Sequence, residues 1–272
     1  MQLQKYFGKS LMNIADRIDT DIFHKIGEVA DAEGRECYVV GGYVRDIFLD
    51  RTSKDIDFVT VGSGIDLARK VAEALGRKAK CNYFPRFGTA QVLTRGLELE
   101  FVGARRESYR SDSRNPIVED GTLDDDISRR DFTINAMAVC VNGDRFGELV
   151  DRFGGIADLE AKIIRTPLDP DITFSDDPLR MFRAIRFATQ LQFEIHPDTL
   201  AAISRNASRI AILSKERIET ELSKIMMSPK PSIGWMLMQS TGLLRPFFPD
   251  LDAMSGVEGV KGRGHKDNFL HP

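Results

Sequence analysis

The chain has 272 residues, of which 42% are hydrophobic and 29% charged, as in a globular protein of one large or two smaller domains. It has no apolar run long enough to span a bilayer, and its N-terminus lacks the apolar core of a signal peptide, so we expect a cytoplasmic protein without a membrane partner. The formal net charge of −3 argues against non-specific coating of nucleic acid, but it leaves room for an enzyme with a local basic groove.

The first half of the chain mixes helix and strand signals. Apolar residues at helical spacing predict helices over 22–30 and 67–75, each followed by a glycine that can end a helix. Short apolar or β-branched runs predict strands over 37–40 and 56–61. Two further strands, over 88–94 and 97–102, are joined by Arg95-Gly96, which is typical of a tight hairpin. We therefore expect an α+β head with flanking helices over residues 1–150.

The second half begins with a polar stretch and then becomes helical. Residues 105–128 are rich in charged residues, Ser, Gly and Pro, and we expect a mobile loop there. Four arginines at 105, 106, 110 and 114 form either a local basic groove or a solvated loop. Helix signals follow over 157–161, 177–191, 200–207, 215–227 and 232–243. We expect an all-α neck over 151–228 and the start of a helical body over 229–272.

Two short motifs in the head indicate binding of phosphate and of a divalent cation. A pair of glycines, Gly41 and Gly42, follows a predicted strand and precedes Arg45, so that backbone N–H groups and a fixed cation can approach phosphates. Asp55 and Asp57 are two apart on the next predicted strand, so both carboxylates point to one face. A divalent cation such as Mg²⁺ suits such a pair. Alone, a glycine pair is usually a turn and an Asp-x-Asp usually a solvated strand end, but the order strand, glycines, helix, acidic strand is far more specific.

A third acidic pair lies on the strand predicted over 97–102. Glu98 and Glu100 share one strand face, where either could serve as a further metal ligand or activate an attacking hydroxyl, or simply face solvent on an edge strand. For Glu98 we prefer the solvent-facing interpretation. The motifs that follow Glu100 support a functional role for it.

Seven blocks in order resemble one family. GGYVRD, KDIDF, LEFVGAR, RRDFTINA, DRFGGIADLEAKIIR, DDPLRMFRAIRF and RIETELSK cover about residues 38–224. Together they resemble the class II tRNA nucleotidyltransferases and bacterial poly(A) polymerases, which have a polymerase-β-like nucleotidyltransferase sheet followed by a helical neck.

The resemblance implies roles for individual head residues. Asp55 and Asp57 match the metal-binding pair, and Glu100 matches a third carboxylate that is more often Asp in the family. Residues of the triphosphate region are Gly41, Gly42, Arg45 and Asp46, and those that hold ribose and phosphates are Arg130, Asp131 and Asn135. From the residues alone, Asp131 could instead cap a helix, because 133–139 looks helical.

The resemblance assigns base selection to the block that begins at Asp176. Asp177 and Arg180 lie three apart, so an acceptor and a forked donor could together read a base edge. Without the resemblance, an intrahelical ion pair would be the preferred interpretation. Arg183 and Arg186 continue at the same spacing, and they either contact nucleotide or RNA or form a solvated helix face.

The implied activity is addition of C, C and A to the tRNA 3′ end from CTP and ATP, with Mg²⁺ and without a template. Poly(A) synthesis and addition of A alone remain open, although Phe87-Gly88-Thr89 looks more like the CCA-adding branch. A nucleotide- or RNA-binding protein that has lost the chemistry is the alternative of another class. Residues 264–269 resemble the opening of a further helical region, so we expect a fragment of a longer protein. We expect ATP, CTP and the tRNA 3′ end as partners, and no obligate protein partner.

Overall fold

The computed structural model describes residues 12–110 and 113–255, and within these ranges it describes the side chains outside 107–117. The chain divides into two compact units, the first comprising residues 1–109 and 115–161 and the second residues 110–114 and 162–272. The first unit thus extends to residue 161, beyond the predicted boundary at 150, because α6 (Gly155–Ala161) packs against the 3₁₀ turn η4 (Thr133–Asn135). The predicted division at residue 228 remains a prediction.

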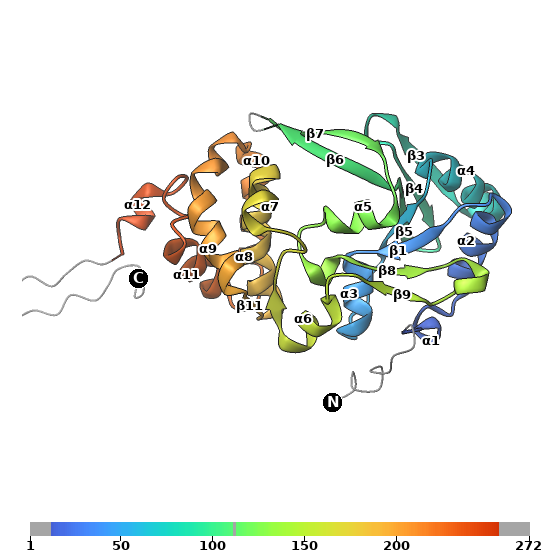
Figure 1. Cartoon of the computed structure of the whole chain (residues 1–272), viewed down its shortest axis with the longest axis horizontal. Coiled ribbons are helices and arrows are strands. Elements are labelled where there is room, and N and C mark those ends of the chain that lie inside the picture. Colours follow the sequence, from blue (N-terminus) through green and yellow to red (C-terminus); the bar gives the residue numbers. More distant parts are fainter. Residues whose placement is uncertain (1–11, 111–112, 256–272) are drawn as a thin grey trace, which may run out of the picture. The chain divides into compact units, whose positions relative to one another are not determined.

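A seven-stranded mixed sheet forms the centre of the first unit, with the order β3-β4-β5-β2-β1-β8-β9 (Figure 1). Its strands are β1 (Cys37–Val40), β2 (Asp55–Thr60), β3 (Lys80–Phe84), β4 (Thr89–Thr94), β5 (Leu97–Gly103), β8 (Met137–Cys140) and β9 (Leu149–Asp151). Strands β2 and β5 run parallel, and the other neighbouring pairs run antiparallel.

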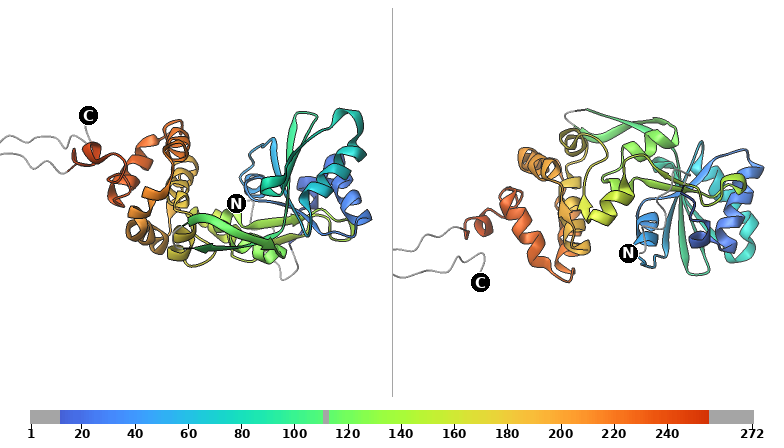
Figure 2. Two further views of the ribbon diagram at one scale, coloured as in Figure 1. Left: turned by 90° about the horizontal axis from the view of Figure 1, so that it is seen from above. Right: turned by 60° about the horizontal axis from the view of Figure 1, so that its bottom comes forward.

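Helices α2 (Asp21–Ala32) and α4 (Gly64–Leu75) cover one face of this sheet, and α5 (Leu123–Ser128) packs on part of the other. Helix α4 packs on β3, β4 and β5, and α2 packs beside it (Figures 1 and 2). The rings of Phe23, Phe58 and Phe101 form the centre of the core between helix and sheet, and all three are buried. The shorter helices are α1 (Ala15–Ile18) and α3 (Gly42–Phe48), and the 3₁₀ turns are η2 (Gly76–Lys78), η3 (Pro85–Phe87) and η5 (Gly143–Arg145).

The hairpin predicted at Arg95-Gly96 is confirmed. Both residues have positive φ, 49° and 78°, as a two-residue hairpin turn requires, and Thr94 pairs with Leu97 across it. The strands predicted over 37–40 and 56–61 and the helices predicted over 22–30 and 67–75 are also present.

Two expectations for the first unit were wrong. Residues 105–128 form strands β6 (Arg105–Arg110) and β7 (Ser113–Asp120), which pair with each other, and helix α5 (Leu123–Ser128). Helix α5 begins with a capping box between Thr122 and Asp125. The polar composition of this segment had favoured a loop over a helix. Residues 133–139 are not a helix, because η4 is followed by β8, whose four residues are buried and three of which pair with β1.

The second unit is helical. Its helices are α7 (Pro170–Asp176), α8 (Leu179–Leu191), α9 (Pro197–Asn206), α10 (Lys215–Met226), α11 (Pro231–Ser240) and α12 (Pro249–Asp252), with the 3₁₀ segment η6 (Ala207–Ile212) and a short parallel pair, β10 (Ile163–Ile164) and β11 (Glu194–Ile195). Helix α8 packs against α7, α10 and α11. Among the described residues, no helix is long and apolar enough to cross a membrane.

The helix predicted over 177–191 is present as α8 but begins two residues later, at Leu179. Asp177 has extended backbone angles (φ −137°, ψ 101°) and separates α8 from α7. The residue before a proline is sterically disfavoured in the helical region, and Pro178 follows Asp177.

Candidate active site

The acidic residues of β2 and β5 lie on one face of the sheet. Asp55 and Asp57 are exposed on β2, while Ile56 between them is buried. Because β2 and β5 are parallel neighbours, Asp57 pairs with Glu100 and Asp55 pairs with Glu98. Glu98 and Glu100 are exposed on either side of the buried Leu99. The predicted carboxylates therefore share one surface, opposite the face that packs on α4.

Two of these carboxylates, Asp57 and Glu100, have raised pKa values. The surrounding protein desolvates Asp57 and raises its pKa, although its side chain keeps contact with solvent; Arg130 opposes this rise and Asp55 adds to it. The pKa of Glu100 is raised by desolvation and then by Asp57, and Arg105 partly offsets the rise. Negative charges that repel one another on one surface favour a cation between them.

The donor chemistry of this surface fits a hard divalent cation. Carboxylate oxygens of Asp55 and Asp57 are ligands of the kind that Mg²⁺ takes, and such ions usually complete their shell with water and substrate phosphates. Within the described ranges, no group of three or more His, Cys, Asp or Glu side chains is gathered as a metal site. Asp55 and Asp57 would therefore supply only part of the shell of such an ion.

Gly41 brings the backbone of the glycine pair against this acidic surface. It has a φ of 73°, and a Cβ atom at this position would lie 2.9 Å from Nη1 of Arg130 and 3.7 Å from Oδ2 of Asp57. Gly42 begins α3, where the nearest atom to an added Cβ would be Nη2 of Arg45 at 3.5 Å. The absence of side chains therefore keeps this corner open beside Asp57 and Arg130.

Four of the predicted nucleotide-binding residues form one hydrogen-bonded chain. Arg45 donates through Nε to Oδ1 of Asp46 (2.9 Å) and through Nη1 to Oδ1 of Asn135 (2.9 Å). Asn135 in turn donates through Nδ2 to Oδ1 of Asp131 (3.0 Å). Asp131 also accepts from the backbone N–H of Phe132 rather than capping a helix, so the capping interpretation was wrong. These contacts join the predicted triphosphate region to the predicted ribose region.

A buried carboxylate that sequence reasoning missed holds Arg130 in place. Asp126 is fully buried and accepts from Nη2 and Nε of Arg130 at 2.9 and 3.2 Å, and it also pairs with Arg129. Burial would raise the pKa of Asp126, but the two guanidinium groups outweigh it and hold the pKa below its usual value. The signal was present in the sequence, since acidic and basic residues three and four apart meet on a helical turn.

In the second unit, Asp177 and Arg180 do not form the intrahelical pair of the simpler interpretation. Asp177 accepts through Oδ1 from the backbone N–H of Leu179 (3.1 Å), and its Oδ2 lies 3.8 Å from Nη2 of Arg217. Arg180 sits in the first turn of α8, and its backbone N–H donates to the carbonyl of Asp177 (3.0 Å). The two residues are thus placed by the break between α7 and α8.

The arginines that continue along α8 differ from each other. Arg183 is half-buried, with its guanidinium 5.6 Å from the ring centre of Phe187. Arg186 is buried and donates through Nε to Oε2 of Glu221 (2.5 Å). Both expectations for Arg186, an RNA contact and a solvated face, were therefore wrong, because it forms an ion pair that joins α8 to α10.

The mixed sheet, the acidic pair beside a glycine turn and the helical unit that follows define a nucleotidyltransferase head with a helical neck. Residues 37–165 match the family described as the poly A polymerase head domain, and residues 192–255 match the one described as the probable RNA and SrmB-binding site of polymerase A. The chain therefore belongs to the family of tRNA nucleotidyltransferases and poly(A) polymerases.

Relatives of differing specificity are similar to this chain. It is 39% identical over 230 residues to an A-adding tRNA nucleotidyltransferase of Geobacter sulfurreducens, covering 83% of this chain and 26% of the relative. It is 38% identical over 224 residues to a CC-adding tRNA nucleotidyltransferase of Halalkalibacterium halodurans, covering 82% and 52%. The solved structure of a Thermotoga maritima CCA-adding enzyme with tRNA superimposes with a TM-score of 0.76 at 29% identity, covering 89% of this chain and 58% of that one. The chain thus spans between a quarter and three-fifths of these proteins.

Proposed function

We propose that this chain is a tRNA nucleotidyltransferase that adds C, C and A to the tRNA 3′ end from CTP and ATP, without a nucleic-acid template and with release of pyrophosphate. It would work in the cytoplasm and without an obligate protein partner. The observation that carries the proposal is the set of Asp55, Asp57 and Glu100 on one sheet face beside Gly41 and Arg130. A protein that only binds nucleotides has no use for three carboxylates that destabilise one another.

In the proposed reaction, the RNA 3′-hydroxyl oxygen forms a bond to the α-phosphorus of the nucleotide, and the bond from that phosphorus to the bridging oxygen breaks. Asp55 and Asp57 would hold Mg²⁺, which when bound supplies charge neutralisation at the phosphates. Glu100 would accept the hydroxyl proton, a role that suits a carboxylate whose pKa is raised. Arg130, anchored by Asp126, would place a fixed positive charge at the reacting phosphate.

Other residues would bind and select the nucleotide. The chain of Arg45, Asp46, Asp131 and Asn135 would hold its ribose and phosphates in one orientation. Asp177 and Arg180 would read the base edge, since a carboxylate accepts and a guanidinium donates hydrogen bonds as a pairing base does. Arg183 would act beside them on the same helix.

The order of C and A addition is the finer part of the proposal. Similarity does not decide the order of addition, because relatives named A-adding, CC-adding and CCA-adding all match this chain. In the family that this chain resembles, enzymes that add only CC tend to have a shortened segment here, so the substantial length of residues 105–128 favours complete CCA addition. We propose that this segment, which contains the β6–β7 hairpin, reshapes the pocket between C and A addition; unchanged A addition after its deletion would refute that role.

The test uses purified protein, Mg²⁺ and three tRNAs that end before CCA, after C and after CC. CTP and ATP are supplied singly and together, and the products are sequenced. Faithful completion of CCA on all three tRNAs supports the proposal. Long A tails would mean a poly(A) polymerase, and A added only after CC would mean an A-adding enzyme. Nucleotide binding without any extension would instead favour a binding fragment of a larger protein.

A further inference from the structure

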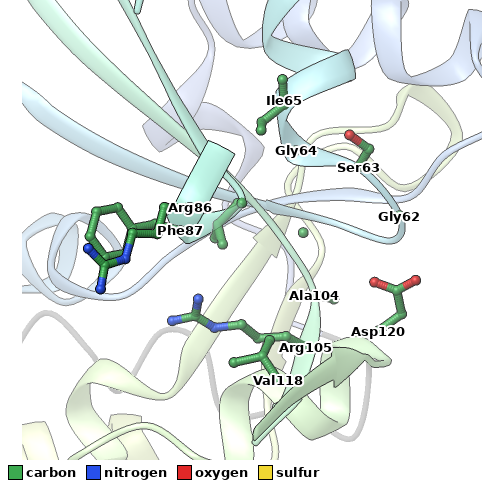
Figure 3. A pocket seen from close by; sticks show the side chains of 13 residues that line it. Gly62, Ser63, Gly64, Ile65, Arg86, Phe87, Ala104, Arg105, Val118 and Asp120 are labelled. Carbon is green, nitrogen blue, oxygen red and sulfur yellow. The ribbon is translucent and has the colours of Figure 1, made fainter. Parts of the chain in front are cut away.

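A cavity in the first unit lies at the ends of β2 and β5, beside the site described above. Its volume is about 740 Å³. Three segments form its walls: residues 62–65 at the start of α4, residues 86–88 in the turn between β3 and β4, and residues 102–105 at the end of β5 (Figure 3). Val118 and Asp120 of β7 complete the lining.

This cavity adjoins the acidic surface. Val102, which lines it, is two residues beyond Glu100 on β5, so both side chains point to the same face of the sheet. Arg105, also in the lining, partly offsets the rise in the pKa of Glu100. A strand of RNA whose 3′-hydroxyl reaches the carboxylates could therefore continue into this cavity with its preceding nucleotides.

The side chains at the opening have the chemistry that single-stranded RNA requires. Phe87 is 63% exposed, more than any other exposed Phe or Tyr side chain in the described part of the chain. The guanidinium carbon of Arg86 lies 6.0 Å from its ring centre, and Arg105 extends into the same space (Figure 3). An exposed aromatic ring that can stack on a base, flanked by cations for the phosphates, is the usual platform for unpaired nucleotides. The one acidic side chain of the lining, Asp120, lies across the opening from Arg86 (Figure 3).

The local backbone maintains this arrangement. Gly88 has a left-handed conformation (φ 64°) at the end of η3, which lets the chain turn from Phe87 directly into β4. A Cβ on Gly64 would lie 2.6 Å from the backbone carbonyl carbon of Val102, and one on Gly103 would clash with the carbonyl oxygen of Gly62. The backbone segments at Gly64 and Gly103 can pack this closely only because neither residue has a side chain, so no side chain enters the cavity from these two positions.

We propose that this cavity binds the unpaired 3′ strand of the RNA substrate just upstream of the reacting nucleotide. Phe87 stacks on a base, and Arg86 and Arg105 bind phosphates. The inference rests on the proposed function in that it takes RNA as the acceptor. It also gives a physical role to Phe87-Gly88-Thr89, which the proposed reaction leaves without one.

The test compares Phe87→Ala and Arg86→Gln with a matched control, Tyr83→Ala. Tyr83 is 46% exposed on β3 and pairs with the buried Ala90, so it lies on the opposite, α4-covered face of the same hairpin. The probes are two fluorescein-labelled RNA hairpins, one blunt and one with an unpaired 3′ strand of three nucleotides, and binding is followed by anisotropy without nucleotide. Because Phe87→Ala loses the stacking on one base, it should bind the hairpin with the unpaired 3′ strand at least about fivefold more weakly than the unaltered chain does. Its affinity for the blunt hairpin should be unchanged, and Tyr83→Ala should bind both hairpins as the unaltered chain does.

Steady-state kinetics then separate this inference from the proposed function. Phe87→Ala should raise KM for tRNA and leave KM for CTP and ATP unchanged. A rise in nucleotide KM without a change in RNA affinity would overturn the inference, as would equal losses for blunt and overhanging hairpins or unaltered binding by both variants. If the unaltered chain incorporates no nucleotide, the proposed function fails, whereas selective loss of overhang binding in Phe87→Ala would still support the RNA-binding cavity.

Discussion

Replacing Gly41 with alanine tests whether the glycine turn, Arg130 and Asp57 act as one assembly. The new Cβ would lie 2.9 Å from Nη1 of Arg130, and the φ of 73° is unfavourable for any residue with a side chain. Arg130 cannot yield freely, because Asp126 holds its guanidinium through contacts of 2.9 and 3.2 Å. We expect the free energy of unfolding to fall by about 1–3 kcal/mol, the usual range for such backbone strain.

The same substitution should also change catalysis in a particular direction. Arg130 lowers the pKa of Asp57, so displacing Arg130 lets that pKa rise further. Metal binding needs the ionised carboxylate, and the acid limb of the pH–rate profile in Mg²⁺ should therefore move to higher pH.

The matched control is Gly34→Ala, at a φ of 62° with no atom within 4 Å of the added Cβ. It carries backbone strain alone, costing about 1–2 kcal/mol, and should leave the pH–rate profile in place. Urea unfolding gives the stability of both variants, and nucleotide incorporation from pH 5 to 9 gives their profiles. Identical stability losses together with identical profiles would refute the assembly.

Three further predictions concern charge. Asp57→Asn should reduce incorporation on every tRNA at least about 100-fold in single-turnover assays, while nucleotide binding in the absence of metal persists; near-normal rates would remove Asp57 from the chemistry. Because the pKa values of Asp57 and Glu100 are raised, these two groups bind more protons in the folded state than in the unfolded chain, so their contribution to metal-free stability should fall as pH rises from about 4 through the raised values. Chemical unfolding of the unaltered chain and of Asp57→Asn at several pH values, without Mg²⁺, isolates the contribution of Asp57; a stability difference between the two that shifts in favour of the unaltered chain as pH rises over that window would contradict it. Glu221→Ala should cost about 3–5 kcal/mol by removing the buried carboxylate that neutralises Arg186, whereas exposed Glu219→Ala should cost little; equal midpoints in urea would show that the ion pair is unimportant.

Local patterns in the sequence were sufficient to predict the strands that carry the acidic residues and the turn that precedes the second of them. The strands that carry Asp55, Asp57 and Glu100, and the turn at Arg95-Gly96, depend on side-chain alternation and turn chemistry within a few residues. The same alternation placed the carboxylates on one strand face. Only the parallel pairing of β2 with β5 brought Glu100 beside Asp57, because strands distant along the chain choose their neighbours through the whole sheet.

Tertiary structure decided the remaining features. The segment after Thr133 has apolar residues compatible with a helix, but β8 is buried and hydrogen-bonded to β1, and that pairing outweighs local propensity. Arg186 looks like a surface residue until Glu221, 35 positions away, supplies its buried partner. The sequence by itself therefore determined the motifs and the chemistry they carry. The fold determined which of the charged groups face substrate and which support the core, because burial and long-range pairing involve residues that no local window contains.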